Sequence, residues 1–384
     1  MEDSKRASPV GADPADSAVL STVPAVSGPL RGLRIIEFAG LGPAPFACML
    51  LADMGAEIVR IDRPGAGATD PRDLIGRGRT NIGLDLKDPQ AVAQVLDLLD
   101  HADALVEGFR PGVMERLGLG PDAVAQRNPA LVYGRMTGWG QDGPLARAAG
   151  HDINYIAITG ALAAIGEAGR GPVPPLNLVG DYGGGSLYLV MGLLAAMLEA
   201  RNSGRGQVVD AAICDGALSL MSLSQTQSLR GQFREERGSN MLDGGAPYYC
   251  TYATLDAAYV SLGPIEPKFF SLLCEKLELP AQWHDGQRDR SRWEGLRGAI
   301  AASIARRTRQ EWCDLLEGSD VCFAPVLTIS EAAAHPHIKA RGSFVELQGV
   351  KHIAPAPRFS RTPSAARAAR MTSAPELLQA WCKS

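Results

Sequence analysis

The chain has 384 residues, of which 46% are apolar and 21% charged, and 38 basic against 42 acidic side chains leave a formal charge of −4. A balance this close to neutral favours neither nucleic-acid binding nor binding to a membrane surface. The length and composition are those of a globular protein with one large or two medium-sized domains.

The seven cysteines are scattered and form no C-x-x-C pair. This pattern argues against a disulfide framework and a zinc site, and it predicts a reducing compartment, the cytoplasm. No uninterrupted apolar run is long enough to span a bilayer. The first 29 residues are rich in Ala, Pro, Ser and Asp and lack the basic and apolar regions of a signal peptide, so they are predicted to form a disordered N-terminal extension.

Folded structure is predicted from Leu30 onwards. Residues 33–38 and 57–62 have the composition of strands, and residues 44–54 between them that of a helix, with tight glycine turns. Such a βαβ unit predicts a parallel sheet. Further strands are predicted at 104–107, 131–136 and 207–213, and further helices at 89–99, 186–200 and 217–229. The helix at 186–200 is apolar all round, which predicts that it is buried.

A second, smaller α+β domain is predicted after a polar linker at residues 233–240. It comprises a β element at 244–263, helices at 267–277, 292–306 and 310–316, and a strand at 321–327. The predicted fold class is therefore α/β, a Rossmann-like large domain with a parallel sheet plus a smaller α+β domain. The predicted divisions are 1–29 for the extension, 30–232 for the large domain, 233–330 for the small domain with its linkers, and 331–384 for a C-terminal segment that returns to the large domain.

Two stretches of the large domain allow alternative interpretations. Gly40-x-Gly42 carries only part of the G-x-G-x-x-G fingerprint, which favours a plain first turn over a dinucleotide site. Residues 60–87 are irregular and basic, with arginines at 60, 63, 72, 77 and 79 and Lys87. A solvated loop and a phosphate-binding rim of guanidinium groups explain this stretch equally well.

His151, in the motif G-H-D-I-N-Y, is the first candidate for proton chemistry. Asp152 or Asn154 could cap a helix that starts here, which would leave His151 at the helix N-terminus. That position favours the neutral imidazole, the form that acts as a base. Since most histidines are structural or lie at the surface, a structural role stays open.

Two acids are further candidates. Asp181 precedes Gly183, Gly184 and Gly185, which would allow the backbone to approach a ligand closely at a helix N-terminus. It is either an N-cap or a carboxylate that exchanges a proton or attacks as a nucleophile. Glu266, held between Pro264 and Pro267, either begins a helix or orients His151.

Several motifs between Pro29 and Arg361 are long and specific. They include L-R-G-L-R-I-I-E-F-A-G-L-G-P-A-P-F-A, A-D-M-G-A-E-I-V-R-I-D-R-P, E-G-F-R-P-G-V-M-E-R-L-G-L-G-P, R-M-T-G-W-G-Q-D-G-P, G-H-D-I-N-Y and N-L-V-G-D-Y-G-G-G-S. With them the sequence resembles the family III (CaiB/BaiF-type) CoA-transferase superfamily and, within it, the α-methylacyl-CoA racemases. Transferases of this superfamily have a nucleophilic aspartate at the position of Asp181 and no histidine at that of His151, whereas the racemases have both.

The resemblance therefore implies an isomerase that interconverts (R)- and (S)-2-methylacyl-CoA thioesters by α-proton abstraction and reprotonation through an enolate. A family III CoA-transferase with Asp181 as nucleophile is the alternative. His151, paired with Glu266, would serve one face of the α-carbon, and Asp181, hydrogen-bonded by Asn177, the other. Arg116 would act electrostatically, and backbone N–H groups near Asp152 would stabilise the enolate oxygen.

The resemblance also implies the binding residues and the partners. Substrate and CoA would contact Arg63, Leu84, Asp85, Leu86, Lys87, Glu107, Arg110, Gly150, Asp152, Ile153, Asn154 and Tyr155, which favours the phosphate-binding interpretation of the basic stretch. The implied assembly is an interlocked homodimer, in which Glu266 would reach the site of the partner subunit. No metal and no separate cofactor are implied, because coenzyme A is part of the substrate.

Overall fold

The computed structural model describes residues 27–66 and 70–383. Its centre is a seven-stranded sheet in the order β12-β3-β2-β1-β4-β5-β6, in which every neighbouring pair is parallel. This confirms the parallel α/β class. The strands are β1 (Arg34–Phe38), β2 (Glu57–Asp62), β3 (Arg79–Gly83), β4 (Ala104–Glu107), β5 (Val132–Thr137), β6 (Val208–Ala212) and β12 (Arg370–Met371).

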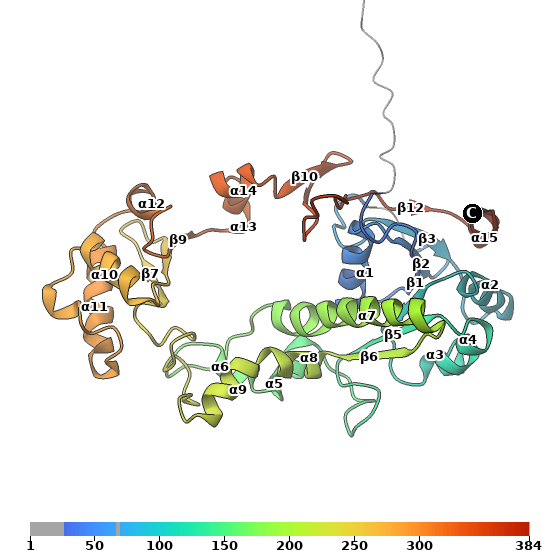
Figure 1. Ribbon diagram of the computed structural model, residues 1–384, viewed down its shortest axis with the longest axis horizontal. Helices are drawn as coiled ribbons and strands as arrows, with labels where there is room; N and C mark the ends of the chain where they lie inside the picture. The colour runs from blue at the N-terminus through green and yellow to red at the C-terminus, as the bar shows by residue number, and fades with distance from the viewer. Residues whose placement is uncertain (1–26, 67–69, 384) are drawn as a thin grey trace, which may run out of the picture.

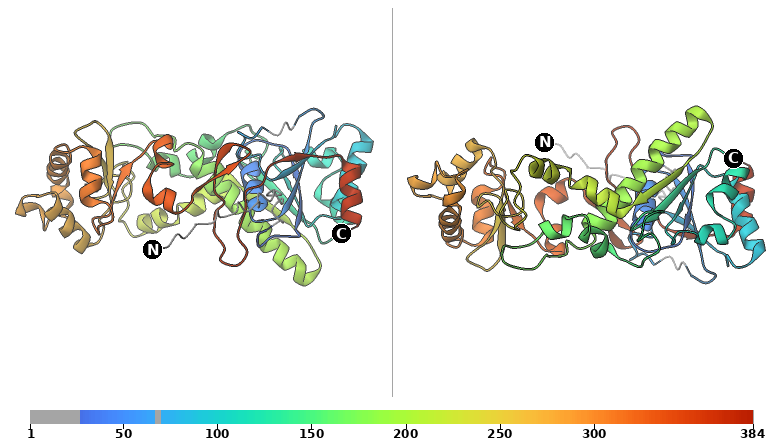
Figure 2. Two further views of the ribbon diagram at one scale, coloured as in Figure 1. Left: turned by 90° about the horizontal axis from the view of Figure 1, so that it is seen from above. Right: turned by 90° about the horizontal axis from the view of Figure 1, so that it is seen from below.

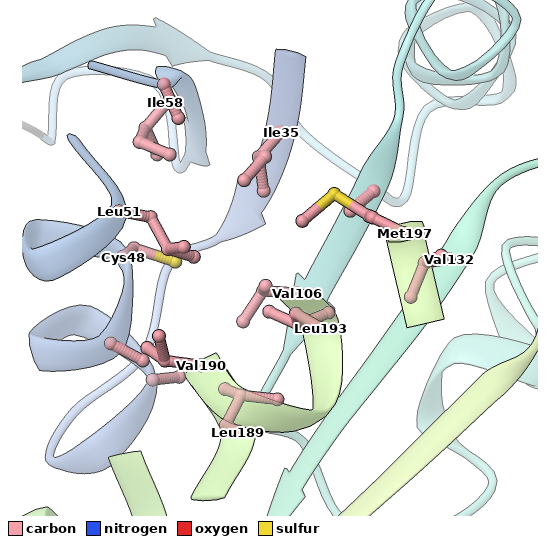
Figure 3. Close-up of a cluster of buried hydrophobic side chains, with 14 of the residues drawn as sticks. Ile35, Cys48, Leu51, Ile58, Val106, Val132, Leu189, Val190, Leu193 and Met197 are labelled. Carbon is pink, nitrogen blue, oxygen red and sulfur yellow. The ribbon is translucent and has the colours of Figure 1, made fainter. Parts of the chain in front are cut away.

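Helices cover both faces of this sheet (Figure 1). On one face α1 (Pro43–Asp53) and α7 (Leu187–Ser203) pack over side chains such as Ile35 (Figure 3). On the other, the cluster around Ile36 contains residues of the helices α2 (Pro89–Leu99), α4 (Pro121–Arg127) and α15 (Ala374–Cys382). Successive strand residues point to opposite faces, so an apolar pair such as Ile35 and Ile36 anchors both layers.

A π-helix, η1 (Leu178–Ser186), continues directly into α7. The combined run Leu178–Ser203 is long and apolar enough to cross a membrane by length and composition alone, a test that core helices also pass. Its inner face, with Leu189 and Leu193, is fully buried. Within this chain the helix is not buried all round as predicted, because Leu187, Met191 and Leu198 are 52%, 58% and 64% exposed.

The three consecutive glycines lie inside η1, where they pack against protein. A Cβ on Gly184 would lie 2.8 Å from the backbone nitrogen of Ala217, and one on Gly185 would lie 3.0 Å from the Ile213 side chain. Both contacts are with α8 (Ile213–Leu220). The glycines therefore allow two helices to approach closely, which corrects the prediction that they admit a ligand.

The predicted helix at 217–229 is two helices, because the chain turns at Met221 between α8 and α9 (Ser222–Leu229). Short helices complete this half of the molecule. They are α3 (Val113–Arg116), α5 (Asp152–Ala157) and α6 (Ala161–Ala164).

The basic stretch contains a strand, β3, that the polar sequence did not predict. Arg79 of β3 is fully buried and donates to Glu37 of β1 at 2.9 Å. Arg77 is 3% exposed and pairs with Asp53 of α1. Arg79 also donates to the Pro45 carbonyl of α1, so both buried arginines hold α1 to the sheet and are not part of a phosphate-binding rim.

A smaller unit lies at the far end of the molecule from the seven-stranded sheet (Figures 1 and 2). Its antiparallel sheet has the order β7-β8-β9, and its own core gathers around Phe270, Ile300 and Trp312. The elements are β7 (Cys250–Ala253), β8 (Tyr259–Leu262), β9 (Phe323–Val326), α10 (Pro267–Lys276), α11 (Trp293–Ile304), α12 (Arg309–Leu316) and the 3₁₀ turns η2 (Ala281–Trp283) and η3 (Arg290–Arg292).

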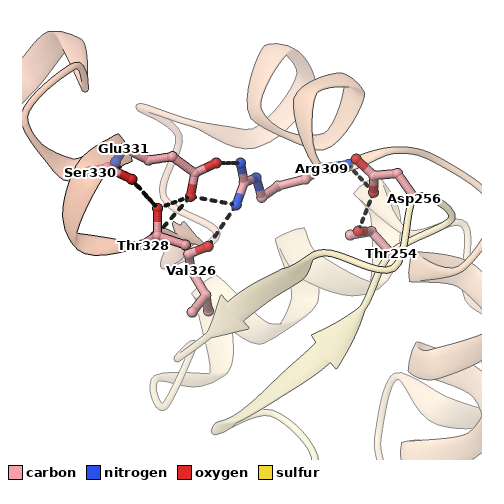
Figure 4. Close-up of polar contacts among 7 residues, drawn as sticks. All are labelled: Thr254, Asp256, Arg309, Val326, Thr328, Ser330 and Glu331. Carbon is pink, nitrogen blue, oxygen red and sulfur yellow. Dashed lines mark hydrogen bonds and ion pairs between the residues drawn. The ribbon is translucent and has the colours of Figure 1, made fainter.

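The chain then returns to the large sheet, where β12 pairs with β3. Where the return begins, Arg309 of α12 contacts Glu331 and the Val326 carbonyl (Figure 4). The returning elements are α13 (Ile329–Ala332), α14 (Pro336–Ala340) and the hairpin of β10 (Phe344–Leu347) and β11 (Val350–Ile353), followed by β12 and α15.

The exact divisions at 30, 233 and 331 stay predictions. Most of the predicted extension, residues 1–26, lies outside the described residues. Ser27 is described, and its hydroxyl donates to the Pro363 carbonyl at 2.7 Å. Described structure is therefore already present before the predicted start at Leu30.

Candidate active site

The sheet has a topological switch point at the carboxyl ends of β1 and β4, because β1 pairs with β2 on one side and with β4 on the other. Gly42 lies in the loop after β1, with φ +73°, in the left-handed region that glycine tolerates. A Cβ at Gly42 would lie 3.1 Å from Oδ2 of Asp181. The Asp181 carboxylate therefore lies above the switch point, where open α/β sheets bind their ligands.

Asp181 lies in the first turn of η1 and is not the N-cap, which is Asn177. Its backbone N–H donates to Oδ1 of Asp152 at 2.6 Å. Burial and then the charge of Asp152 raise the pKa of Asp181 to about 6, while the nearby His151 acts in the opposite direction. A carboxyl group with this pKa exchanges protons readily near neutral pH.

His151 is itself the N-cap of α5, and its imidazole belongs to an exposed residue at that helix N-terminus. Its backbone N–H donates to Oδ1 of Asn154 at 3.0 Å. The predicted position of His151 is thus confirmed. Neither Asp152 nor Asn154 is the N-cap residue itself, but the Asn154 side chain caps the helix start through a capping box with His151.

Tyr155 holds the loop that leads into His151. Its hydroxyl donates to the Gly150 carbonyl, and its ring packs edge-on against Trp139 with centroids 4.8 Å apart. A Cβ on Gly138 would lie 2.0 Å from this ring, so the glycine makes room for it. Burial and then the charge of Asp181 raise the pKa of Tyr155, and Arg110 lowers it. The polar groups of α5, η1 and the β4 loop thus belong to one electrostatic cluster.

The other predicted binding residues gather along the same edge of the sheet. Arg63 follows β2, and Arg110 lies in the loop after β4. The four residues after β3 alternate, with half-buried leucines packed on the sheet cluster and exposed charged side chains; they are Leu84, Asp85, Leu86 and Lys87. Parallel strands thus bring together residues far apart in the sequence.

Glu107 and Arg116 both contact the loop that follows β4. The Glu107 side chain is completely buried, pairs with Arg135 at 2.9 Å and accepts from the Phe109 N–H at 2.7 Å. It therefore shapes the loop from within and offers no exposed carboxylate to a ligand. Nη1 of Arg116 lies 3.3 Å from where a Cβ of Gly112 would be, so this guanidinium folds over the same loop.

Two predicted pairs are not formed within this chain. Asn177 accepts from the Tyr182 N–H through its carbonyl, and no hydrogen bond joins its side chain to Asp181 among residues 27–66 and 70–383. Glu266 is the exposed N-cap of α10 in the smaller unit, where its charge acts on Cys322. In the described part of the chain no hydrogen bond or ion pair links it to His151.

The sequence did not indicate two further features of the site. The Asp152 carboxylate accepts from the Asp181 backbone N–H, whereas the sequence suggested it as a helix cap and a substrate contact. Phe46 of α1 stacks on Tyr182 with centroids 4.1 Å apart, which ties η1 to α1 beside Asp181. The spacing of these residues along the chain carries no signal for either contact.

Comparison with known proteins agrees with this geometry. Residues 30–379 match the protein family described as CoA-transferase family III. An α-methylacyl-CoA racemase of Mus musculus is 42% identical over 348 residues, 90% of this chain and 91% of the relative. A succinyl-CoA–D-citramalate CoA-transferase of Chloroflexus aurantiacus is 32% identical over 361 residues, 87% of this chain and 89% of the relative. A crystal structure from Mycobacterium tuberculosis superimposes with a TM-score of 0.75 at 27% identity, covering 91% of this chain and 98% of that one. The chain belongs to CoA-transferase family III.

Proposed function

We propose that the chain is an isomerase that interconverts (R)- and (S)-2-methylacyl-CoA thioesters by 1,1-proton transfer. The proposal rests on one observation: Asp181 lies above the switch point within electrostatic reach of His151, and its pKa is raised to about 6. The 42% identity to a racemase over 90% of the chain supports the same reaction.

The reaction follows from two proton carriers on opposite faces of one carbon. The thioester carbonyl acidifies the α-C–H bond, and either His151 or Asp181 removes that proton while the electron pair moves onto the carbonyl oxygen. Backbone N–H groups at the start of α5 would stabilise the resulting enolate. The other residue then returns a proton to the opposite face, so that one proton leaves, one arrives and the configuration inverts.

The CoA portion would lie along the carboxyl edge of the sheet. Arg63, Lys87 and Arg110 are exposed cations there, placed by three different strands. Guanidinium and ammonium groups bind phosphate through charge-assisted hydrogen bonds, which suits the phosphates of coenzyme A. Arg116, folded over the β4 loop, would add to this positive field.

The active assembly that we propose is an interlocked homodimer in which Glu266 completes the partner's site beside His151. Large apolar side chains remain exposed on α7, α8 and α9, as expected of a surface that a partner covers. They include Leu187, Met191 and Leu198 of α7, Leu218 and Leu220 of α8, and Leu223 and Leu229 of α9. We further propose a cytoplasmic location, because the cysteine pattern suits a reducing compartment.

The reaction is tested by following a single enantiomer of a 2-methylacyl-CoA in D₂O by NMR. The proposal predicts that the α-carbon gains deuterium as the compound loses optical purity. The absence of α-exchange across a series of acyl chain lengths would contradict it. If hydroxylamine instead traps an acyl group on Asp181, and CoA moves between two acids while His151→Ala retains activity, the chain is a CoA-transferase.

A further inference from the structure

Asp152 holds the backbone of the proposed proton carrier. It lies in the first turn of α5, next to His151, and its Oδ1 accepts the Asp181 N–H at 2.6 Å. The contact leaves no space beside it, because a Cβ on Gly180 would lie 2.2 Å from the same oxygen. A glycine directly before Asp181 thus allows the two acids to approach.

The second oxygen of Asp152 explains why its charge acts on Asp181. Oδ2 is buried and has no hydrogen-bond partner among the described residues. A buried carboxylate elsewhere in this chain, Asp53, is paired with an arginine. At Asp152 the negative charge is left facing the neighbouring acid, where low polarity strengthens the repulsion.

We infer that Asp152 is a positioning residue for Asp181: it fixes the backbone of η1 by a hydrogen bond and places an uncompensated negative charge beside the Asp181 carboxylate. The inference rests on the proposed function, since the purpose of this arrangement is to let Asp181 both hold and release a proton in one catalytic cycle.

The groups that surround Asp181 make Asp152 the main source of this effect after burial itself. Asp152 raises the pKa of Asp181 and His151 lowers it, both from the start of α5. Beside α1 the nearest contact is the uncharged Gly42. On α8, Asp215 accepts from the Cys214 thiol, and η1 passes directly into the apolar start of α7.

Substitutions at and beside Asp152 separate the effect of its hydrogen bond to Asp181 from the effect of its charge. Asp152→Asn keeps an oxygen that can accept the Asp181 N–H but removes the charge. Asp152→Ala removes both. Gly180→Ala leaves Asp152 intact and displaces its carboxylate sterically. Asp122→Asn is the matched control, because Asp122 is also an acid in the first turn of a helix, α4, but lies outside the site.

The first readout is the pH–rate profile of racemisation. For Asp152→Asn we expect the acidic limb to move from about 6 toward the ordinary carboxyl value of 3.8. Asp152→Ala and Gly180→Ala should in addition lower kcat by about 10- to 100-fold, because the reacting carboxylate is misplaced. If Asp152→Asn gives the wild-type profile, as Asp122→Asn should, Asp152 merely supports the helix terminus and the inference is wrong.

The second readout does not need activity. The thermal midpoints of the wild type and of Asp181→Asn are compared across pH, and the same comparison is repeated with Asp152→Asn present in both proteins. The two curves separate from the ordinary pKa of 3.8 upwards, and their gap stops growing near the folded-state pKa of Asp181. In the pair that carries Asp152→Asn the gap should therefore be smaller at neutral pH and stop growing at a lower pH, and an unchanged gap overturns the inference. A smaller gap without any α-exchange in the wild type keeps the coupling and rejects the racemase.

Discussion

Two carboxylates of this chain experience opposite environments. Glu331 of α13 accepts from Arg309 and from the N–H and hydroxyl of Thr328, and these bonds, the arginine first, lower its pKa to about 2. Asp181 receives no such donors among the described residues; burial and then Asp152 raise its pKa to about 6. The difference shows what each group can do, because a carboxylate tied to a cation stays ionised while one left beside another acid can carry a proton.

The comparison extends to the arginines. Between the smaller unit and the returning segment, the guanidinium of Arg309 pairs with the Glu331 carboxylate and joins the two parts (Figure 4). At the candidate site Arg110 acts on Tyr155 but is not among the groups that act on Asp181. An acid without an arginine or lysine partner in the described chain, lying above a switch point, is therefore a better indicator of chemistry here than the density of charge in the sequence.

The largest expected difference between the two acids, Asp181 and Glu331, is in catalysis. Asp181→Asn should lower the racemisation rate by about 10²- to 10⁴-fold, because a proton carrier is lost. Glu331→Gln, a matched removal of one charge, should leave the rate near that of the wild type. Polarimetry or chiral chromatography of the acyl-CoA measures both. Equal losses in the two variants would mean that Asp181 has only a structural role.

The next effect is on the pH dependence of the racemisation rate. Racemisation requires one group of the pair to accept a proton, so the rate should fall as the pH drops through about 6, where Asp181 becomes protonated. Both enantiomers should show the same acidic limb, since the reaction runs through both groups in either direction. An acidic limb near 4 would contradict the raised pKa of Asp181.

The stability of the fold should also depend on the ionisation of Asp181, but in the opposite direction to the rate: the ionised form supports the reaction and destabilises the fold. Because the folded-state pKa of Asp181 lies above the ordinary value of 3.8, its ionisation destabilises the fold progressively from about pH 4 to about pH 6. Asp181→Asn should therefore be more stable than the wild type at about pH 7.5, by about 1–2 kcal/mol because solvent screens this half-buried group, and no more stable at about pH 3.5. Denaturation at the two pH values tests this, and a stabilisation that does not depend on pH would point to another cause.

The smallest effect concerns Glu331. Its lowered pKa means that it contributes stability above the ordinary value of 4.5, and that this contribution is lost as the pH falls toward 2. Exposed ion pairs of this kind are weak, so Glu331→Gln should lower the melting temperature only slightly at about pH 7. The difference from the wild type should disappear in acid. A difference that persists at about pH 2 would show that the amide disrupts the Thr328 contacts instead.

The sequence predicted the fold where periodicity and composition agree. β2, β4 and α2 have the predicted bounds, because their apolar residues recur at the spacing of a strand or a helix and turn signals stand at both ends. It missed β3, whose Arg79, Thr80 and Asn81 look like a loop but are buried by pairing with Glu37 and neighbouring strands. The Arg79–Glu37 pair joins residues 42 positions apart, so a local pattern cannot reveal it.

At the site, the residue types were predictable and their partners were not. His151 and Asp181 follow from motifs, and the structure places both at the same edge of the sheet. The predicted partner of Asp181 was Asn177, whereas the structure gives Asp152, 29 residues away in the chain. The predicted role of Glu266 depends on a second subunit, which a single chain does not contain. Contacts between elements, which decide partners, depend on tertiary packing rather than on local sequence.

The central claim is that His151 and Asp181 serve opposite faces of one α-carbon. It is tested most directly by the wash-in of deuterium from D₂O into each separate enantiomer of a 2-methylacyl-CoA, catalysed by His151→Ala and by Asp181→Ala. We expect that neither variant racemises, and that each still exchanges the α-proton of one enantiomer, a different one for each variant. Exchange of the same enantiomer by both variants, or wild-type racemisation by either, would contradict it.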